Sequence, residues 1–276
     1  MGFKQAIAEN SLFTKGEGKS FVALLVYVDD IVVVSADLKL IQQIKLHLSN
    51  NFQIKDLGPL KYFLGLEVAR QKNGISVSQR KYDFELLSDA GFMNSKPVYS
   101  PTVPFKKFRN ENDLLDDNSQ YKKLFGKLLY LTITRPDINF ATQHLSQFLE
   151  TPTHLHLQAA HRALRYIKSA PGQGLFFPAS SSLKAFTDSD WGACVDTRRS
   201  VSGFSVYCDN KSTIAIAENP VFHERTKHIE LDCLLIREKL QKGTIRLFHV
   251  AYGNQLADVF AKTHCPRSFF SYVSKL

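Results

Sequence analysis

The stretch FVALLVYVDDIVVV, residues 21–34, is the longest apolar run of the chain, and two adjacent carboxylates, Asp29 and Asp30, interrupt it near its centre. Its many β-branched residues predict buried strand, in which ionised carboxylates are costly unless a solvated turn or a cation receives them. The run therefore predicts a β-hairpin, with strands over Phe21–Tyr27 and Ile31–Ser35 and a turn at Val28–Asp30. Two acids at such a tip suit Mg²⁺, which takes oxygen ligands and shares them with substrate phosphates. Asp-rich hairpin turns are also common in proteins without metal.

The tetrad Tyr27-Val28-Asp29-Asp30 between two strand sequences resembles the polymerase motif of reverse transcriptases. The segments LGPLKYFLGLEV (57–68), SQRKY (78–82) and TRPDI (134–138) resemble copia-type retrotransposon polyproteins, and this resemblance covers nearly the whole chain. It implies RNA-directed DNA synthesis from deoxynucleotides on an RNA or DNA template-primer. It also implies that Asp29 and Asp30 are catalytic Mg²⁺ ligands and that Tyr27 lies against the nucleic acid.

The composition indicates a folded intracellular protein. Hydrophobic residues make up 44% and aromatic residues 12% of the 276 residues, enough for two domains with cores of their own. The net charge of +9 is spread along the chain. Such an excess suits a surface that follows nucleic-acid phosphates, although many basic proteins bind other ligands. No signal peptide or membrane-spanning segment is apparent, so no membrane partner is expected.

Four cysteines at wide spacing, without a Cys-x-x-Cys pair, indicate a reducing compartment, the cytoplasm or the nucleus. A zinc site formed by Cys208, His223, His228 and Cys233 is conceivable, but these spacings match no closed structural zinc site.

The resemblance to copia-type polyproteins implies an α+β protein, which the remaining pattern divides into four parts. Residues 1–93 are expected to form a partial reverse-transcriptase palm, an antiparallel sheet with helices, ending in a primer-grip-like hairpin and the start of the thumb. In that hairpin a strand over Tyr62–Arg70 is joined through Lys72–Gly74 to a strand over Ile75–Ser78. Residues 94–120 are expected to be a linker, 121–180 the thumb and connection helices, and 181–276 a shortened ribonuclease H-like α/β domain.

The helix predicted over His156–Ile167 has a cationic face. Arg162, Arg165 and Lys168 lie close together on the side opposite its apolar stripe. Such a face is most often solvated, but beside the polymerase motif it predicts contacts with nucleic-acid phosphates.

Three acids are predicted at strand or helix ends near the C-terminus. Asp188 ends one strand, Asp209 ends another, and Asp258 lies where a further helix opens. With RRSVSG (198–203) and FHERTKHIE (222–230) between them, they resemble the ribonuclease H domain of copia-type elements. The resemblance implies that all three are catalytic metal ligands of a two-metal nuclease site.

Both implied active sites are expected to be incomplete. The family carries a catalytic glutamate between the first two nuclease acids, but residues 189–208 contain no glutamate and are too few for two strands and a helix. Reverse transcriptases also use an aspartate upstream of the hairpin, and residues 1–26 contain none. The sequence therefore predicts an inactive remnant whose Mg²⁺ binding is doubtful. The alternatives are a nucleic-acid-binding protein without catalysis and a pseudogene-like product without function.

Overall fold

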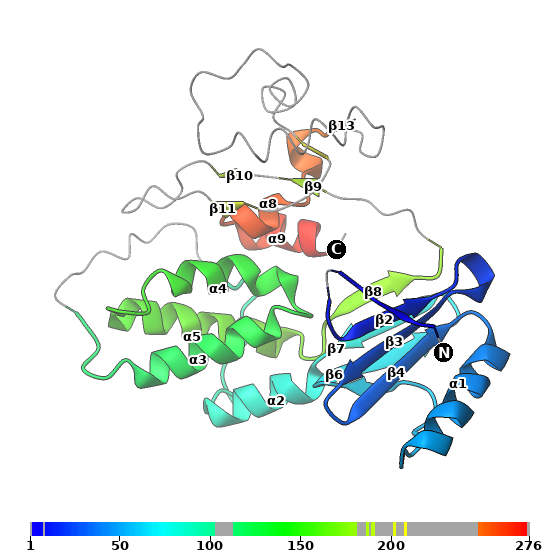
Figure 1. Cartoon of the computed structure of the whole chain (residues 1–276). Helices are drawn as coiled ribbons and strands as arrows, with labels where there is room; N and C mark the ends of the chain where they lie inside the picture. Colours follow the sequence, from blue (N-terminus) through cyan, green and yellow to red (C-terminus); the bar gives the residue numbers. More distant parts are fainter. Residues whose placement is uncertain are drawn as a thin grey trace, which may run out of the picture. The chain divides into compact units, whose positions relative to one another are not determined.

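The computed structural model describes residues 2–7, 9–102, 113–180, 186–187, 189–190, 201–202, 207–208 and 248–274. The chain divides into two compact units, Met1–Phe63 and Leu64–Leu276. Antiparallel sheets and several helices make it an α+β protein (Figure 1). Within the described parts, no helix is long and apolar enough to cross a membrane.

The first unit is an antiparallel meander with one helix. Its strands, in spatial order, are β1 (Lys4–Gln5), β2 (Leu12–Lys15), β3 (Val22–Tyr27) and β4 (Asp30–Ser35), with a short 3-10 helix η1 (Gly18–Ser20) between β2 and β3. Helix α1 (Leu38–Asn51) follows, and β5 (Tyr62–Phe63) ends the unit.

Helix α1 packs on the face of the sheet that carries alternate residues of β3. Val22 and Leu24 of β3 and Ile44 of α1 form the buried core. The helix begins where the Asp37 carboxylate accepts a hydrogen bond from the backbone N–H of Lys39, which satisfies one of the unpaired donors of the first turn.

The second unit contains the predicted second hairpin, with two corrections. Strands β6 (Leu66–Gln71) and β7 (Gly74–Ser78) pair as expected, but the continuous strand predicted over Tyr62–Arg70 is wrong. It breaks at Leu64 and Gly65, which both have positive φ (47° and 81°), and the Tyr130 hydroxyl donates to the Leu64 carbonyl at 2.8 Å. In addition, β8 (Leu175–Pro178), which the sequence did not predict, pairs with β7.

The helices of this unit enclose its core. They are α2 (Arg80–Asp89), α3 (Ser119–Leu131), the 3-10 helix η2 (Pro136–Ile138), α4 (Asn139–Ser146) and α5 (His154–Ser169), and α2 to α5 lie side by side in Figure 1. Helix α2 ends in a glycine cap. Gly91 has φ +74°, and the N–H groups of Gly91 and Phe92 donate to the carbonyls of Ser88 and Leu87, a Schellman arrangement that satisfies the last carbonyls.

The C-terminal part adds short elements to the same unit. Strands β9 (Phe186–Thr187), β12 (Tyr207–Cys208) and β13 (Phe248–His249) form a parallel ladder with β12 in the middle, and β10 (Ser189–Asp190) pairs with β11 (Val201–Ser202). The elements η3 (Tyr252–Asn254), α8 (Asp258–Ala261) and α9 (Pro266–Val273) follow. Val259, Phe269 and Tyr272 belong to the same apolar core as α2–α5, and the Phe269 ring meets Tyr166 of α5 edge-on.

Candidate functional site

The predicted acidic hairpin is present, one residue tighter than expected. Strands β3 and β4 remain paired up to Tyr27 and Asp30, so Asp30 is the first residue of β4 and only Val28 and Asp29 form the turn. Both acids are exposed to solvent. Tyr27 and Asp30 are direct cross-strand partners, so their side chains share one face of the hairpin.

The turn holds Val28 in a conformation that its side chain disfavours. Its φ is +48°, in the left-handed region, where a β-branched residue is strained. A glycine at this position would adopt the same φ without strain. The Val28 side chain is 83% exposed, so packing does not account for this conformation. Strained turns of this kind concentrate at functional sites, where they set the direction of neighbouring side chains.

The hairpin supplies two of the oxygen donors that a Mg²⁺ site needs. Mg²⁺ is commonly bound through one or two carboxylates, with water and substrate phosphates as the remaining ligands, so Asp29 and Asp30 fit such a role. Within the described ranges, no group of three or more His, Cys, Asp or Glu residues is placed to hold a metal ion.

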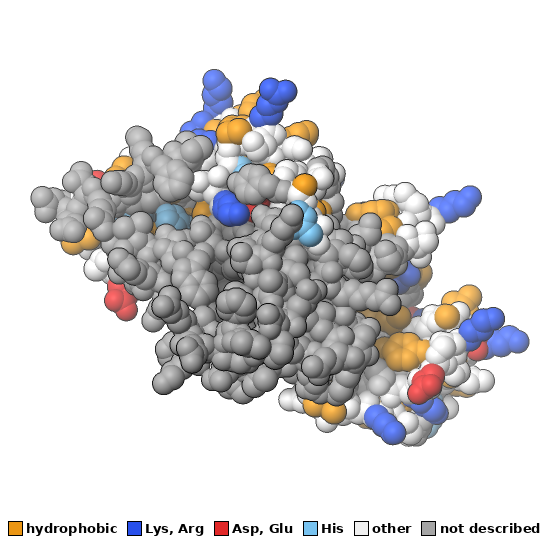
Figure 2. Space-filling view, turned by 90° about the horizontal axis from the view of Figure 1, so that it is seen from above, with side chains coloured by type: hydrophobic (Ala, Val, Ile, Leu, Met, Phe, Trp, Pro, Cys, Tyr) orange, Lys and Arg blue, Asp and Glu red, His pale blue; other side chains and the backbone are white. Residues whose placement is uncertain are grey.

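The three cations of α5, which the sequence predicted to contact nucleic-acid phosphates, make hydrogen bonds within the chain. Arg165 Nε donates to the Lys96 carbonyl at 2.8 Å, Lys168 Nζ to the Ser95 carbonyl at 2.6 Å, and Arg162 Nη2 to Ser100 Oγ at 3.1 Å. The side chains thereby fasten residues 95–100 along α5. Figure 2 shows Lys and Arg side chains at separate points of the described surface, without one merged patch on that face.

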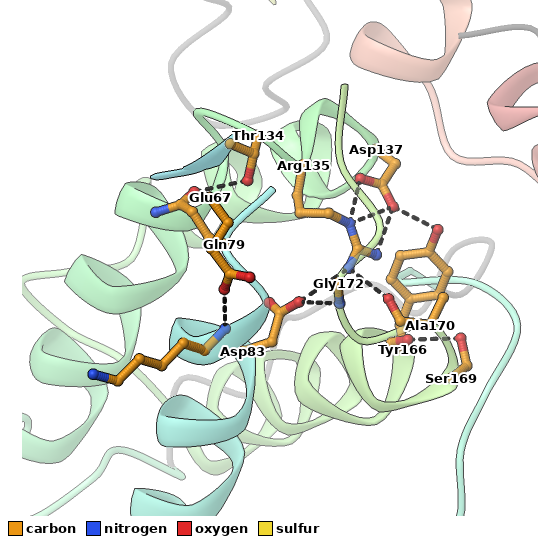
Figure 3. A network of polar contacts seen from close by, with 11 residues as sticks. Glu67, Gln79, Asp83, Thr134, Arg135, Asp137, Tyr166, Ser169, Ala170 and Gly172 are labelled. Carbon is orange, nitrogen blue, oxygen red and sulfur yellow. Dashed lines mark hydrogen bonds and ion pairs between the residues drawn. The ribbon is translucent and has the colours of Figure 1, made fainter. Parts of the chain in front are cut away.

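The motif TRPDI (134–138) forms a buried polar network that the sequence did not predict as a site (Figure 3). The Arg135 guanidinium, with no exposed surface, donates to both carboxylate oxygens of Asp137, and the Tyr166 hydroxyl donates to Asp137 at 2.6 Å. Burial alone would lower the pKa of Arg135, but the adjacent Asp137 raises it on balance. Burial is also the main cause that raises the pKa of Asp83 to about 6. An arginine next to a Pro-Asp pair gave no signal of burial, because charged residues usually lie on the surface.

The structure describes one of the three predicted nuclease acids. Asp258 opens α8 with no exposed surface, and Lys262 Nζ donates to its Oδ1 at 2.9 Å. Asp188 and Asp209 lie outside the described residues, as do His223, His228 and Cys233 of the alternative zinc site and the side chain of Cys208. The strands predicted before the two acids are present: Asp188 follows Thr187 of β9, and Asp209 follows Cys208 of β12.

Comparison with known proteins first identifies the class of protein to which the N-terminal part is similar. The family described as reverse transcriptase (RNA-dependent DNA polymerase) matches residues 1–104, which include the acidic hairpin. No solved structure matches the chain.

Individual relatives narrow this class. The Pol polyprotein of transposon RE1 from Arabidopsis thaliana, described as retrovirus-related, is 33% identical over 335 residues that include all of this chain. The uncharacterized mitochondrial protein AtMg00810 from the same plant is 38% identical over 67% of this chain and 78% of its own length. A putative transposon Ty5-1 protein of Saccharomyces cerevisiae is 30% identical over 74% of this chain and 68% of its own length.

The chain belongs to the family of copia-type retrotransposon Pol polyproteins, as the motifs predicted. It spans 23% of the length of the RE1 polyprotein.

Proposed function

We propose that this chain carries the metal-binding hairpin of a retrotransposon polymerase, the helices that follow it, and a shortened ribonuclease H region. The observation that carries the proposal is the β3–β4 turn, in which a strained Val28 presents Asp29 and Asp30 to solvent. In a complete polymerase of this family these carboxylates would hold Mg²⁺ against the phosphates of a deoxynucleotide, with the template-primer beside Tyr27.

Metal binding at the hairpin is testable without any activity. Mn²⁺ added to the full chain is expected to broaden the backbone amide NMR signals of residues 27–31, because a bound paramagnetic ion relaxes nearby nuclei. The variant Asp29→Asn with Asp30→Asn should lose the broadening. The matched control Asp37→Asn, which removes the carboxylate that caps α1 in the same unit, should keep it. Equal broadening in the double variant would refute the metal site.

These 276 residues alone are expected not to extend a primer. Residues 1–26 contain no aspartate, and the described hairpin offers only two carboxylates. The test is primer extension by the purified chain on a homopolymer template with Mg²⁺ or Mn²⁺. Template-dependent incorporation that disappears in Asp29→Asn would show that the chain completes its own polymerase site.

The ribonuclease H region is proposed to be inactive as well. Thr187, which precedes Asp188 in the sequence, and Cys208, which precedes Asp209, are partners in a parallel ladder. However, residues 189–208 contain no glutamate, and the RE1 alignment is tens of residues longer than this chain, which supports an internal deletion. The full chain is expected not to cleave an RNA–DNA hybrid. Mg²⁺-dependent cleavage that Asp188→Asn abolishes would contradict this.

A second candidate function is nucleic-acid binding without turnover, which the net charge of +9 and the cations of α5 favour. Phosphates would compete with the backbone carbonyls that Arg165 and Lys168 already contact. Affinity for a labelled RNA–DNA hybrid, measured over a salt series, should fall steeply with salt because counterions are released.

Changing Arg162, Arg165 and Lys168 together to Ala should weaken binding and reduce the slope of log K against log salt by up to about 3 units. The control Ser100→Ala removes an internal partner of Arg162 but no charge, and it should keep the slope. Salt-independent affinity, or unchanged affinity in the triple variant, would exclude this surface.

A further inference from the structure

Acidic groups outnumber cations in the buried network around Arg135. The Nε and Nη2 groups of the guanidinium donate to the Asp137 carboxylate at 2.8–3.2 Å, and Nη1 donates to the Ala170 carbonyl at 3.1 Å. Asp83 Oδ2 lies only at the limit of an ion pair, 4.0 Å from Arg135 Nη1. One buried cation is therefore already matched by one buried carboxylate, Asp137.

Asp83 is the second carboxylate of this network, and it is only half satisfied. It has no exposed surface, and its Oδ2 accepts the backbone N–H of Gly172 at 2.7 Å (Figure 3). Its Oδ1 is buried and has no hydrogen-bond partner among the described residues. A buried, ionised and half-satisfied carboxylate is unstable unless it gains a cation or a proton.

The groups that face Asp83 do not supply a cation beyond Arg135. Glu67 of β6 adds negative charge, and its Oε1 is taken by the backbone N–H of Lys81. Arg80, one turn earlier on α2, lies with its alkyl chain against Gly172 and its guanidinium over the Phe84 ring, 5.8 Å from the ring centre. Within the described residues no three-ligand metal group occurs. A proton is therefore the fitting partner.

We propose that Asp83 is a proton-binding site that joins helix α2 to the turn at Gly172. When Asp83 takes up one proton, the buried cluster of Asp83, Arg135 and Asp137 becomes electrically neutral. The turn connects α5 to β8, while Arg135 holds the end of α5 through the Ala170 carbonyl. Proton uptake thereby acts where α2, η2, α5 and the β6–β7–β8 sheet meet.

The sign of the effect follows from the two states of the chain. Burial raises the pKa of Asp83 from 3.8 to about 6 in the folded chain, whereas the unfolded chain keeps the ordinary value. The stabilisation of the folded chain by protonation of Asp83 is therefore fully present below pH 3.8, and it is lost as the pH rises through about 6. Between pH 7.5 and 5.0, Asp83 should raise the folding equilibrium constant about tenfold.

Urea unfolding of the full chain at pH 7.5 and 5.0 tests the proposal. Asp83→Asn imitates the neutral carboxyl. The rise of its folding equilibrium constant between pH 7.5 and 5.0 should therefore be about tenfold smaller than that of the unchanged chain. The control Asp89→Asn lies on the same helix and removes an exposed ion pair to Lys127, which lowers the pKa of Asp89. The Asp89→Asn variant should therefore show the same rise in its folding equilibrium constant between pH 7.5 and 5.0 as the unchanged chain. An equal pH dependence in the unchanged chain and in Asp83→Asn would overturn the proposal.

A second measurement does not depend on the stability of any variant. The carboxyl carbon of Asp83, followed by NMR in the unchanged chain, should titrate near pH 6, and the Gly172 amide shift should follow the same curve. A carboxyl titration midpoint below pH 4.5 would overturn the proposal.

Discussion

Replacing Arg135 with Met should be among the most destabilising single changes in the second unit. The guanidinium is fully buried, and its loss removes three hydrogen bonds to Asp137, one to the Ala170 carbonyl, and a cation–π contact 5.5 Å from the Tyr166 ring centre. The Asp137 and Asp83 carboxylates then remain buried without a cation. Breaking a buried pair in this way costs about 3–5 kcal/mol.

Urea unfolding of the full chain at pH 7.5, followed by far-UV circular dichroism, measures this cost. In a thermal scan, a loss of that size corresponds to a midpoint lower by roughly 6–20 °C for a domain of 150–250 residues. The control Lys127→Met removes the exposed ion pair with Asp89, and it should cost no more than about 1 kcal/mol.

A double-mutant cycle separates the ion pair from simple loss of packing. Asp137→Asn alone should also cost several kcal/mol, because it leaves the Arg135 cation without its main partner. Arg135→Met with Asp137→Asn should cost less than the sum by about 2 kcal/mol, since the two changes remove the same interaction. The reasoning fails if Arg135→Met costs under about 1 kcal/mol, or if the two single changes simply add.

Three further changes have expected outcomes. Val28→Gly should raise the stability of the first unit by about 1 kcal/mol, seen in urea unfolding, because it relieves the positive φ of a β-branched residue; a loss of stability would contradict the assignment of strain. Gly65→Ala should destabilise the second unit, because an added Cβ would lie 2.4 Å from the Tyr130 hydroxyl and φ is +81°; an unchanged urea midpoint would contradict this. His156→Gln should keep the capping box with Thr153. Burial lowers the pKa of His156 to about 4, so the stability that neutral His156 contributes to the folded chain is lost as the pH falls from 6.5 towards 4. In urea unfolding over that pH range, His156→Gln should therefore lose less stability than the unchanged chain.

Local sequence patterns predicted the elements of this chain because they depend on near neighbours. An apolar run rich in β-branched residues, interrupted by two adjacent carboxylates, placed the β3–β4 hairpin to within one residue. The polymerase-like Tyr27-Val28-Asp29-Asp30 motif was visible for the same reason, since its residues are consecutive. The family membership followed from such motifs and agrees with the relatives.

Tertiary structure alone decided which charges are buried and what they contact. Arg135 and Asp83 are 52 positions apart, and only the packing of α2 against α5 brings both to the Gly172 turn. The helical pattern placed Arg165 and Lys168 on a cationic face predicted to contact phosphates, but the earlier segment 95–100 lies along α5 and gives them carbonyl partners. Strand β8 likewise exists only because β7 lies beside it. Burial and long-range pairing depend on contacts between residues distant in sequence, so composition and periodicity carry no direct signal for them.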